Sequence, residues 1–94
     1  MSTNNVAEET FEIMNELGMH ARAATKFVQT ANRYKADVNI EKDGQVVNGK
    51  SIMGVLLLAA AKGTFIKVTC SGDDAPAALT ALRTLVVEEK FGEP

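Results

Sequence analysis

The chain has 94 residues, a length that suits one compact domain and is too short for two independent hydrophobic cores. Apolar residues make up 46% and charged residues 23%, a balance that argues against intrinsic disorder. The formal net charge of −2 gives no basic excess for the phosphates of a nucleic acid, so we expect no nucleic-acid partner.

The first predicted elements are a strand and a helix. Residues 10–14 alternate in polarity, which predicts a strand with Phe11 and Ile13 on one face, and residues 15–18 form a loop. The period then changes to that of an amphipathic helix, which we expect from about Ala21 to Tyr34. Its apolar stripe consists of Ala24, Phe27, Val28 and Ala31.

A hairpin and a short apolar helix follow. The dipeptide Asp43-Gly44 between strands at 38–41 and 45–47 favours a tight type I′ turn, so these strands should pair antiparallel. Ser51 can cap a helix over residues 52–58, and Gly63 is expected to close that helix.

The last two elements are a strand and a helix. Residues 64–71 predict a strand, and residues 72–74 predict a turn. Asp74 is expected to cap the final helix, with Pro76 in its first turn. The strand should present Ile66, Val68 and Cys70 on one face, and the helix should bury Ala75, Ala78, Leu79, Leu82, Leu85 and Val86.

The resulting order, βαββαβα, predicts an α+β fold. Four short strands offer one extended apolar face, and each of the three helices has one apolar stripe to bury. We therefore expect an open-faced two-layer sandwich, with three helices on one face of a four-stranded, mainly antiparallel sheet. Residues 1–94 should form a single domain in which residues 1–7 are frayed.

Cysteine use and the absence of targeting signals predict a compartment. Cys70 is the only cysteine, so no internal disulfide is possible, and its strand setting predicts a buried, inert thiol. Residues 1–6 lack the pattern of a secretory signal, and the longest apolar run, 55–61, is far below the ~20 residues needed to span a bilayer. We expect a cytoplasmic protein without membrane insertion.

His20, the sole histidine, lies between a glycine-containing loop and the predicted first turn of a helix. Unpaired amides and the positive end of the helix dipole can hold a phosphoryl group there without a metal. Neutral imidazole is a competent nucleophile, and Arg22 adds a guanidinium that binds phosphate oxygens in pairs. Without further information, a histidine just before a helix could also be an ordinary helix cap.

Two segments resemble the HPr family of histidine-containing phosphocarriers in the bacterial phosphotransferase system. Residues 18–24, Gly-Met-His-Ala-Arg-Ala-Ala, are similar to the active-site motif Gly-Leu-His-Ala-Arg-Pro-Ala, and residues 47–54 resemble the regulatory-serine motif around Ser51. The resemblance implies a carrier rather than an enzyme. Nδ1 of His20 would accept the phosphoryl group from phospho-enzyme I and donate it to an enzyme IIA. Arg22 and the amides of the phosphate-binding residues 21–23 (Ala21, Arg22 and Ala23) would balance its charge.

The resemblance also implies partners and regulation. Ser51 would be a regulatory phosphorylation site for an HPr kinase/phosphorylase, and a transcriptional regulator is a further partner. Met19, Lys26, Lys50, Ile52 and Met53 would form the partner-docking surface, although Ile52 or Met53 could instead pack into the core. We expect a monomer that needs no metal or other cofactor.

Three alternatives remain open. Ala23 replaces the family proline, which frees an amide and loosens the torsions of Arg22, and this fits a regulatory paralogue that acts through phosphorylated Ser51. A nitrogen-related phosphocarrier would share every feature above. A small α/β hydrolase would need a water-activating base near His20, and no carboxylate is close to it in sequence.

Overall fold

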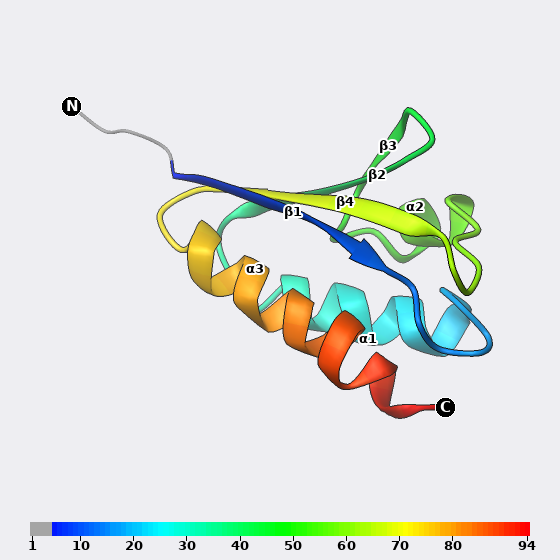
Figure 1. Ribbon diagram of the computed structural model, residues 1–94. Helices are drawn as coiled ribbons and strands as arrows, with labels where there is room; N and C mark the ends of the chain where they lie inside the picture. The colour runs from blue at the N-terminus through cyan, green and yellow to red at the C-terminus, as the bar shows by residue number, and fades with distance from the viewer. Residues whose placement is uncertain (1–4) are drawn as a thin grey trace.

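One antiparallel sheet with strand order β1-β4-β2-β3 organises the fold (Figure 1). The computed structural model describes residues 5–94. Its elements are β1 Val6–Glu12, α1 Ala21–Ala31, β2 Asp37–Lys42, β3 Gln45–Asn48, α2 Ile52–Leu57, β4 Phe65–Ser71 and α3 Ala75–Arg83. Helices α1 and α3 lie along one face of the sheet, and α2 packs beside α1 and β3. The predicted βαββαβα open-faced sandwich is confirmed.

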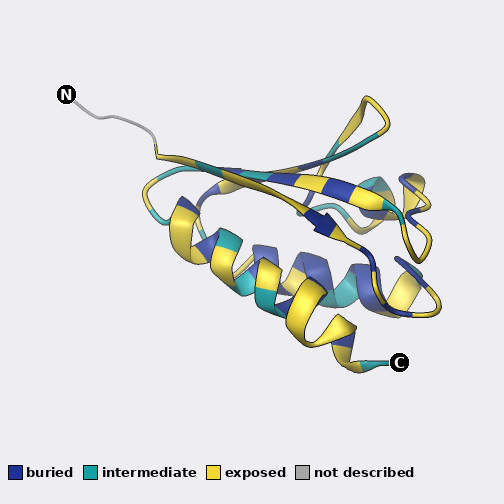
Figure 2. Cartoon of the chain, in the orientation of Figure 1, coloured by how far each residue is buried: buried dark blue, intermediate teal, exposed yellow. Residues whose placement is uncertain are grey.

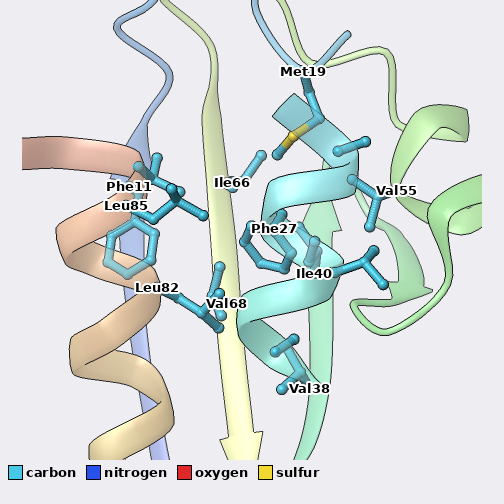
Figure 3. Packing of buried hydrophobic residues seen from close by; sticks show 14 of the residues in the cluster. Phe11, Met19, Phe27, Val38, Ile40, Val55, Ile66, Val68, Leu82 and Leu85 are labelled. Atoms are coloured by element: carbon cyan, nitrogen blue, oxygen red, sulfur yellow. The ribbon is translucent and has the colours of Figure 1, made fainter. Parts of the chain in front are cut away.

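The central strand β4 shows how the sequence pattern sets the two faces of the sheet. Ile66, Val68 and Cys70 are fully buried, whereas Phe65 and Lys67 are exposed, as the alternation predicted (Figure 2). The buried side chains meet those of α1 and α3 in one continuous core (Figure 3). Burial raises the pKa of the Cys70 thiol, in agreement with the predicted inert cysteine.

Strand β1 begins earlier than the sequence suggested. The prediction placed it at residues 10–14 and expected fraying up to residue 7, but Val6 and Ala7 pair with Ser71 and Cys70. Val6 is exposed and Ala7 only partly buried, so the backbone ladder with β4 holds them, which side-chain alternation does not reveal. Residues 1–4 lie outside the described part of the chain. Phe11 and Ile13 are both buried, as predicted.

Helix α1 ends at Ala31, three residues before the predicted end. The amides of Arg33 and Tyr34 bond to carbonyl oxygens only three residues back, so the chain tightens into a turn instead of continuing the helix. The predicted stripe is buried throughout. The hairpin between β2 and β3 has positive φ at both Asp43 (52°) and Gly44 (84°), which confirms the type I′ turn.

The start of α2 was predicted correctly and its end was not. The Ser51 hydroxyl accepts from the Gly54 amide at 3.0 Å, so Ser51 is the N-cap. The helix stops at Leu57, and Ala59 adopts the left-handed φ of 48° that was expected of Gly63. Gly63 lies in a separate turn, where its amide donates to Ile13 at 2.7 Å.

Asp74 does not cap α3 with its side chain. Its carboxylate instead accepts 2.8 Å bonds from the amides of Lys35 and Ala36, at the start of the chain leading into β2. Pro76, the second residue of α3, has no amide proton, so one of the donors that an N-cap side chain usually binds is missing. The predicted inward stripe is confirmed: Ala75, Ala78 and Leu82 of α3 are buried, Leu79 is partly buried, and the buried Leu85 and Val86 continue the stripe just beyond the end of α3.

The chain after α3 contains a reversal that the sequence did not predict. A π-helical turn covers Thr84–Glu88, and a short turn covers Lys90–Gly92. Lys90, Phe91 and Gly92 all have positive φ (49°, 59° and 74°), so the chain folds back toward α1 while the Phe91 side chain is completely buried. Among the described residues, no helix is long and apolar enough to cross a membrane.

Candidate functional site

His20 is the N-cap of α1, with extended backbone torsions (φ −80°, ψ −179°). Its Nδ1 lies 3.3 Å from the backbone nitrogen of Arg22. An amide can only donate a hydrogen bond, so Nδ1 must carry the lone pair, and in the neutral ring the proton resides on Nε2. The imidazole is 23% exposed, which leaves it accessible at the surface but held on both sides.

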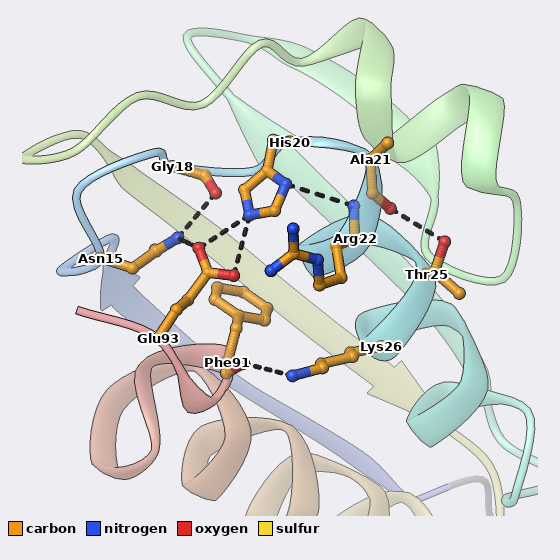
Figure 4. Close-up of polar contacts among 9 residues, drawn as sticks. All are labelled: Asn15, Gly18, His20, Ala21, Arg22, Thr25, Lys26, Phe91 and Glu93. Carbon is orange, nitrogen blue, oxygen red and sulfur yellow. Dashed lines mark hydrogen bonds and ion pairs between the residues drawn. The ribbon is translucent and has the colours of Figure 1, made fainter.

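The other ring nitrogen faces a carboxylate from the far end of the chain. Nε2 lies 2.7 Å from Oε1 and 2.9 Å from Oε2 of Glu93, a residue 73 positions later (Figure 4). The Glu93 side chain is only 9% exposed. His20 is therefore fixed between a helix-start amide and a shielded carboxylate.

Asn15 holds Glu93 in place. Its fully buried amide nitrogen donates to Oε1 of Glu93 at 2.9 Å and to the carbonyl oxygen of Gly18 at 2.8 Å. Burial by itself raises the pKa of Glu93, but the hydrogen bonds from Asn15 and His20 and the positive charge of Arg22 outweigh burial and lower it. Glu93 is therefore ionised at neutral pH.

The first turn of α1 offers free donors beside the imidazole. Within residues 5–94, the amides of Ala21 and Ala23 have no hydrogen-bond acceptor, and the Arg22 amide has only Nδ1 of His20. The first helical bond is made by Ala24, whose amide donates to the His20 carbonyl at 2.8 Å. The exposed Arg22 side chain extends beside the ring (Figure 4). The predicted site residues 20–23 are thus contiguous in space.

The two lysines expected to contact partners are partly engaged within the fold. The ammonium group of Lys26 donates to the carbonyl oxygen of Phe91 at 2.6 Å, and that of Lys50 donates to the carbonyl oxygen of Tyr34 at 2.7 Å. Both bonds satisfy carbonyls at chain reversals, so the lysines stabilise turns in addition to any role at the surface.

The apolar residues expected at the docking surface divide into two groups. The prediction for Met19 is wrong, because its side chain is 5% exposed and packs into the core between α1 and β4 (Figure 3). Ile52 and Met53 are 41% and 78% exposed, so they belong to the surface and not to the core. Leu57 and Leu17, which the sequence analysis did not select, are 68% and 70% exposed.

Sequence reasoning missed Asn15 and Glu93. It found no carboxylate near His20 because it considered only residues close in sequence. Glu93 is 73 positions away and is brought next to His20 by the chain reversal at Lys90–Gly92. A polar residue three positions before Gly18 was a weak signal for Asn15. Nothing in the sequence around Glu93 indicated its partner.

The chain was compared with known proteins. A family model described as "PTS HPr component phosphorylation site" matches residues 7–88, a range that ends before Glu93. The chain is 49% identical to "Phosphocarrier protein HPr" of Neisseria meningitidis serogroup A, over 92% of this chain and 96% of that protein. It is 43% identical to "HPr-like protein Crh" of Bacillus subtilis, over 89% and 99%. The crystal structure of "HPr-C-His" from Thermoanaerobacter tengcongensis superposes with a TM-score of 0.89 at 45% identity, covering 94% of this chain and 98% of that one.

Proposed function

Because this chain belongs to the HPr family of phosphocarrier proteins, we propose that it accepts a phosphoryl group from phospho-enzyme I on Nδ1 of His20 and donates it to enzyme IIA components. The observation that carries this proposal is the state of the His20 ring. Its Nδ1 bears the lone pair and faces the helix start, where the phosphoryl oxygens would meet amide donors.

The chemistry follows from the donors around Nδ1. As the lone pair attacks phosphorus, the Arg22 amide is released from Nδ1 and becomes available to a phosphoryl oxygen, together with the free amide of Ala21. The Ala23 amide also lacks an acceptor within residues 5–94, but Ala23 is completely buried. The helix start and the guanidinium of Arg22 both favour the incoming negative charge. Because these donors are already in position, little reorganisation accompanies transfer. No metal or other cofactor enters this scheme.

Docking is assigned to the exposed apolar residues of α2 and the neighbouring loop. Ile52, Met53 and Leu57 form a surface of flexible, apolar side chains, which suits successive binding of different partners. Leu17, in the loop before His20, is a further exposed apolar residue that we assign to docking. We also propose that the positive charges of Lys26 and Lys50 attract acidic groups of enzyme I or enzyme IIA. We assign this exchange to a monomer in the cytoplasm.

Regulation is assigned to Ser51. Its hydroxyl caps α2 and is partly exposed, so phosphorylation by an HPr kinase/phosphorylase would place charge at the helix start, beside Ile52 and Met53. A second candidate function, that of a regulatory paralogue which binds a transcriptional regulator, is favoured by Ala23 in place of the family proline and by the similarity to "HPr-like protein Crh".

The test is incubation of the purified protein with phosphoenolpyruvate and an enzyme I, followed by mapping of acid-labile phosphate. We expect one phosphate on His20 and none in His20→Ala. Phosphate elsewhere in His20→Ala would contradict the proposal. A wild-type protein that gains no phosphate at His20 but is labelled at Ser51 by an HPr kinase would favour the regulatory paralogue.

A further inference from the structure

We propose that Glu93 is a positioning residue for His20: its carboxylate accepts the Nε2 proton and thereby keeps Nδ1 as the nitrogen with the free lone pair. This inference rests on the proposed function, since it deepens the role of His20 as phosphoryl acceptor. The carboxylate does not contact the phosphoryl group. It acts on the reaction through the ring.

The geometry around the imidazole leaves one arrangement of the proton. Nδ1 faces an amide donor at 3.3 Å, and Nε2 faces carboxylate oxygens at 2.7 and 2.9 Å. A proton on Nδ1 would oppose the amide proton of Arg22 and leave two lone pairs facing each other at Nε2. A flipped ring would place a carbon atom where each of these contacts now occurs. The two neighbours together select one tautomer and one ring orientation.

Glu93 is itself held firmly enough to act in this way. Asn15 fixes Oε1, the amide of Glu16 donates to the carbonyl oxygen of Pro94 at 2.7 Å, and Lys26 binds the carbonyl of Phe91. The completely buried ring of Phe91 anchors the same segment in the core. The segment that carries Glu93 is thus attached to the loop before His20, to α1 and to the core.

The carboxylate also matches the change in charge during transfer. When Nδ1 donates its electron pair to phosphorus, the bond between phosphorus and the donor's leaving atom breaks, and that atom keeps the electron pair. The Nε2 proton stays on the ring, which becomes positively charged. Glu93, 2.7 Å away and shielded from solvent, stabilises this charge without any proton movement.

The first experiment measures the tautomer and needs no partner protein. Long-range ¹H–¹⁵N NMR spectra distinguish a protonated from an unprotonated ring nitrogen, and they are recorded above the pH at which His20 becomes neutral. In the wild type we expect the proton on Nε2 alone. In Glu93→Ala we expect a mixture of the two tautomers, and in the control Glu88→Ala, which removes an exposed carboxylate, we expect the wild-type spectrum. Unchanged ring shifts in Glu93→Ala would overturn the inference.

The second experiment measures the reactivity of Nδ1 with phosphoramidate, a small donor whose N–P bond breaks as ammonia leaves. By analogy with carboxylates that orient histidine ligands, Glu93→Ala should react about 10–100-fold more slowly than the wild type. Glu93→Gln keeps an acceptor for Nε2 and removes the charge, so its rate should lie between these two. A wild-type rate in Glu93→Ala would overturn the inference. If Glu93→Ala fails to fold, Glu93→Gln is measured in its place, and a wild-type rate in that variant would overturn the inference.

The two proposals fail in different ways. If enzyme I does not phosphorylate His20 but the tautomer and the phosphoramidate rate depend on Glu93, the proposed function is wrong and the positioning role stands. If enzyme I phosphorylates wild type and Glu93→Ala at the same rate and the ring shifts are equal, the positioning role is wrong and the proposed function stands.

Discussion

The ammonium group of Lys26 in α1 and the carbonyl oxygen of Phe91 are joined by a 2.6 Å hydrogen bond. This bond links the helix that begins at His20 to the segment that carries Glu93. In the same segment the Phe91 ring is completely buried, and the successive residues Lys90, Phe91 and Gly92 all have positive φ. The C-terminal segment is therefore an integral part of the fold.

Phe91→Ala should lower the free energy of unfolding by about 3–5 kcal/mol, because it removes a fully buried aromatic ring. Urea denaturation measures this loss. Phe65→Ala is the matched control, since that ring is 58% exposed and its removal should change stability far less. Equal losses in the two variants would show that the C-terminal segment contributes nothing specific.

Arg22→Ala should leave the fold intact and slow phosphoryl transfer to His20. The side chain is exposed, so its loss removes little packing, but it removes a charged donor worth roughly 2–4 kcal/mol in the transition state, by analogy with a single oxyanion donor. Rapid-quench measurement with enzyme I gives the rate. Arg22→Lys keeps the charge but cannot bind two phosphoryl oxygens in parallel, so its transfer rate should lie between those of the wild type and Arg22→Ala. Wild-type rates in Arg22→Ala would show that the amides suffice.

Ala23→Pro should raise the free energy of unfolding by up to about 1 kcal/mol, because the Ala23 amide has no acceptor in residues 5–94 and proline restricts the unfolded chain. Ala24→Pro, one residue later, is the control. The Ala24 amide makes the first helical bond, so this variant should lose about 3 kcal/mol. Transfer to His20 should be as fast in Ala23→Pro as in the wild type. A slower rate in a stable Ala23→Pro protein would identify the Ala23 amide as a required donor.

Ser51→Ala should lose roughly 1 kcal/mol of stability, because the Gly54 amide loses its side-chain acceptor. Ser51→Asp keeps an acceptor and should remain close to the wild type in melting temperature. It should nevertheless slow phosphorylation of His20 by enzyme I, because its charge must be desolvated at the docking surface. Equal rates for the wild type and both variants would leave Ser51 as a cap without a switching role.

The Asp74 carboxylate should make stability depend on pH in a defined range. The Lys35 amide first, and then the Ala36 amide, lower the pKa of Asp74 below its ordinary value of 3.8 despite some burial. A carboxyl with a lower pKa in the folded state stabilises the protein above the unfolded pKa, and this contribution is lost as the pH falls through the folded pKa. Asp74→Asn should therefore melt below the wild type at pH 7, and the gap should shrink as the pH falls below the ordinary aspartate pKa of 3.8. Asp73→Asn, at an exposed neighbour, is the matched control and should melt with the wild type at pH 7.

The sequence predicted those parts of the fold that depend on side-chain periodicity. The stripes of α1 and α3, the two faces of β4 and the Asp43-Gly44 turn were all correct. Errors arose where backbone bonds decide the outcome: the first residues of β1 pair through the ladder, and α2 ends at Leu57, with the left-handed residue at Ala59 and not at Gly63.

The sequence predicted the part of the site whose residues are adjacent in the chain. His20, Arg22 and the amides of the first turn are adjacent in the chain, so the motif alone places them together. Asn15 and Glu93 are joined by tertiary structure, and Met19 is buried by contacts that no local pattern shows. The contacts that orient the imidazole therefore required the structure.

The strand order has a consequence for biosynthesis. β1 is made first, yet the structure pairs it with β4 alone, so its edge stays open until residues 65–71 have been translated. The nascent chain can form α1 and the β2–β3 hairpin early, because their contacts are local. Pairing between His20 and Glu93 comes later still, so chains that stall in translation after β4 would expose a histidine that lacks its carboxylate.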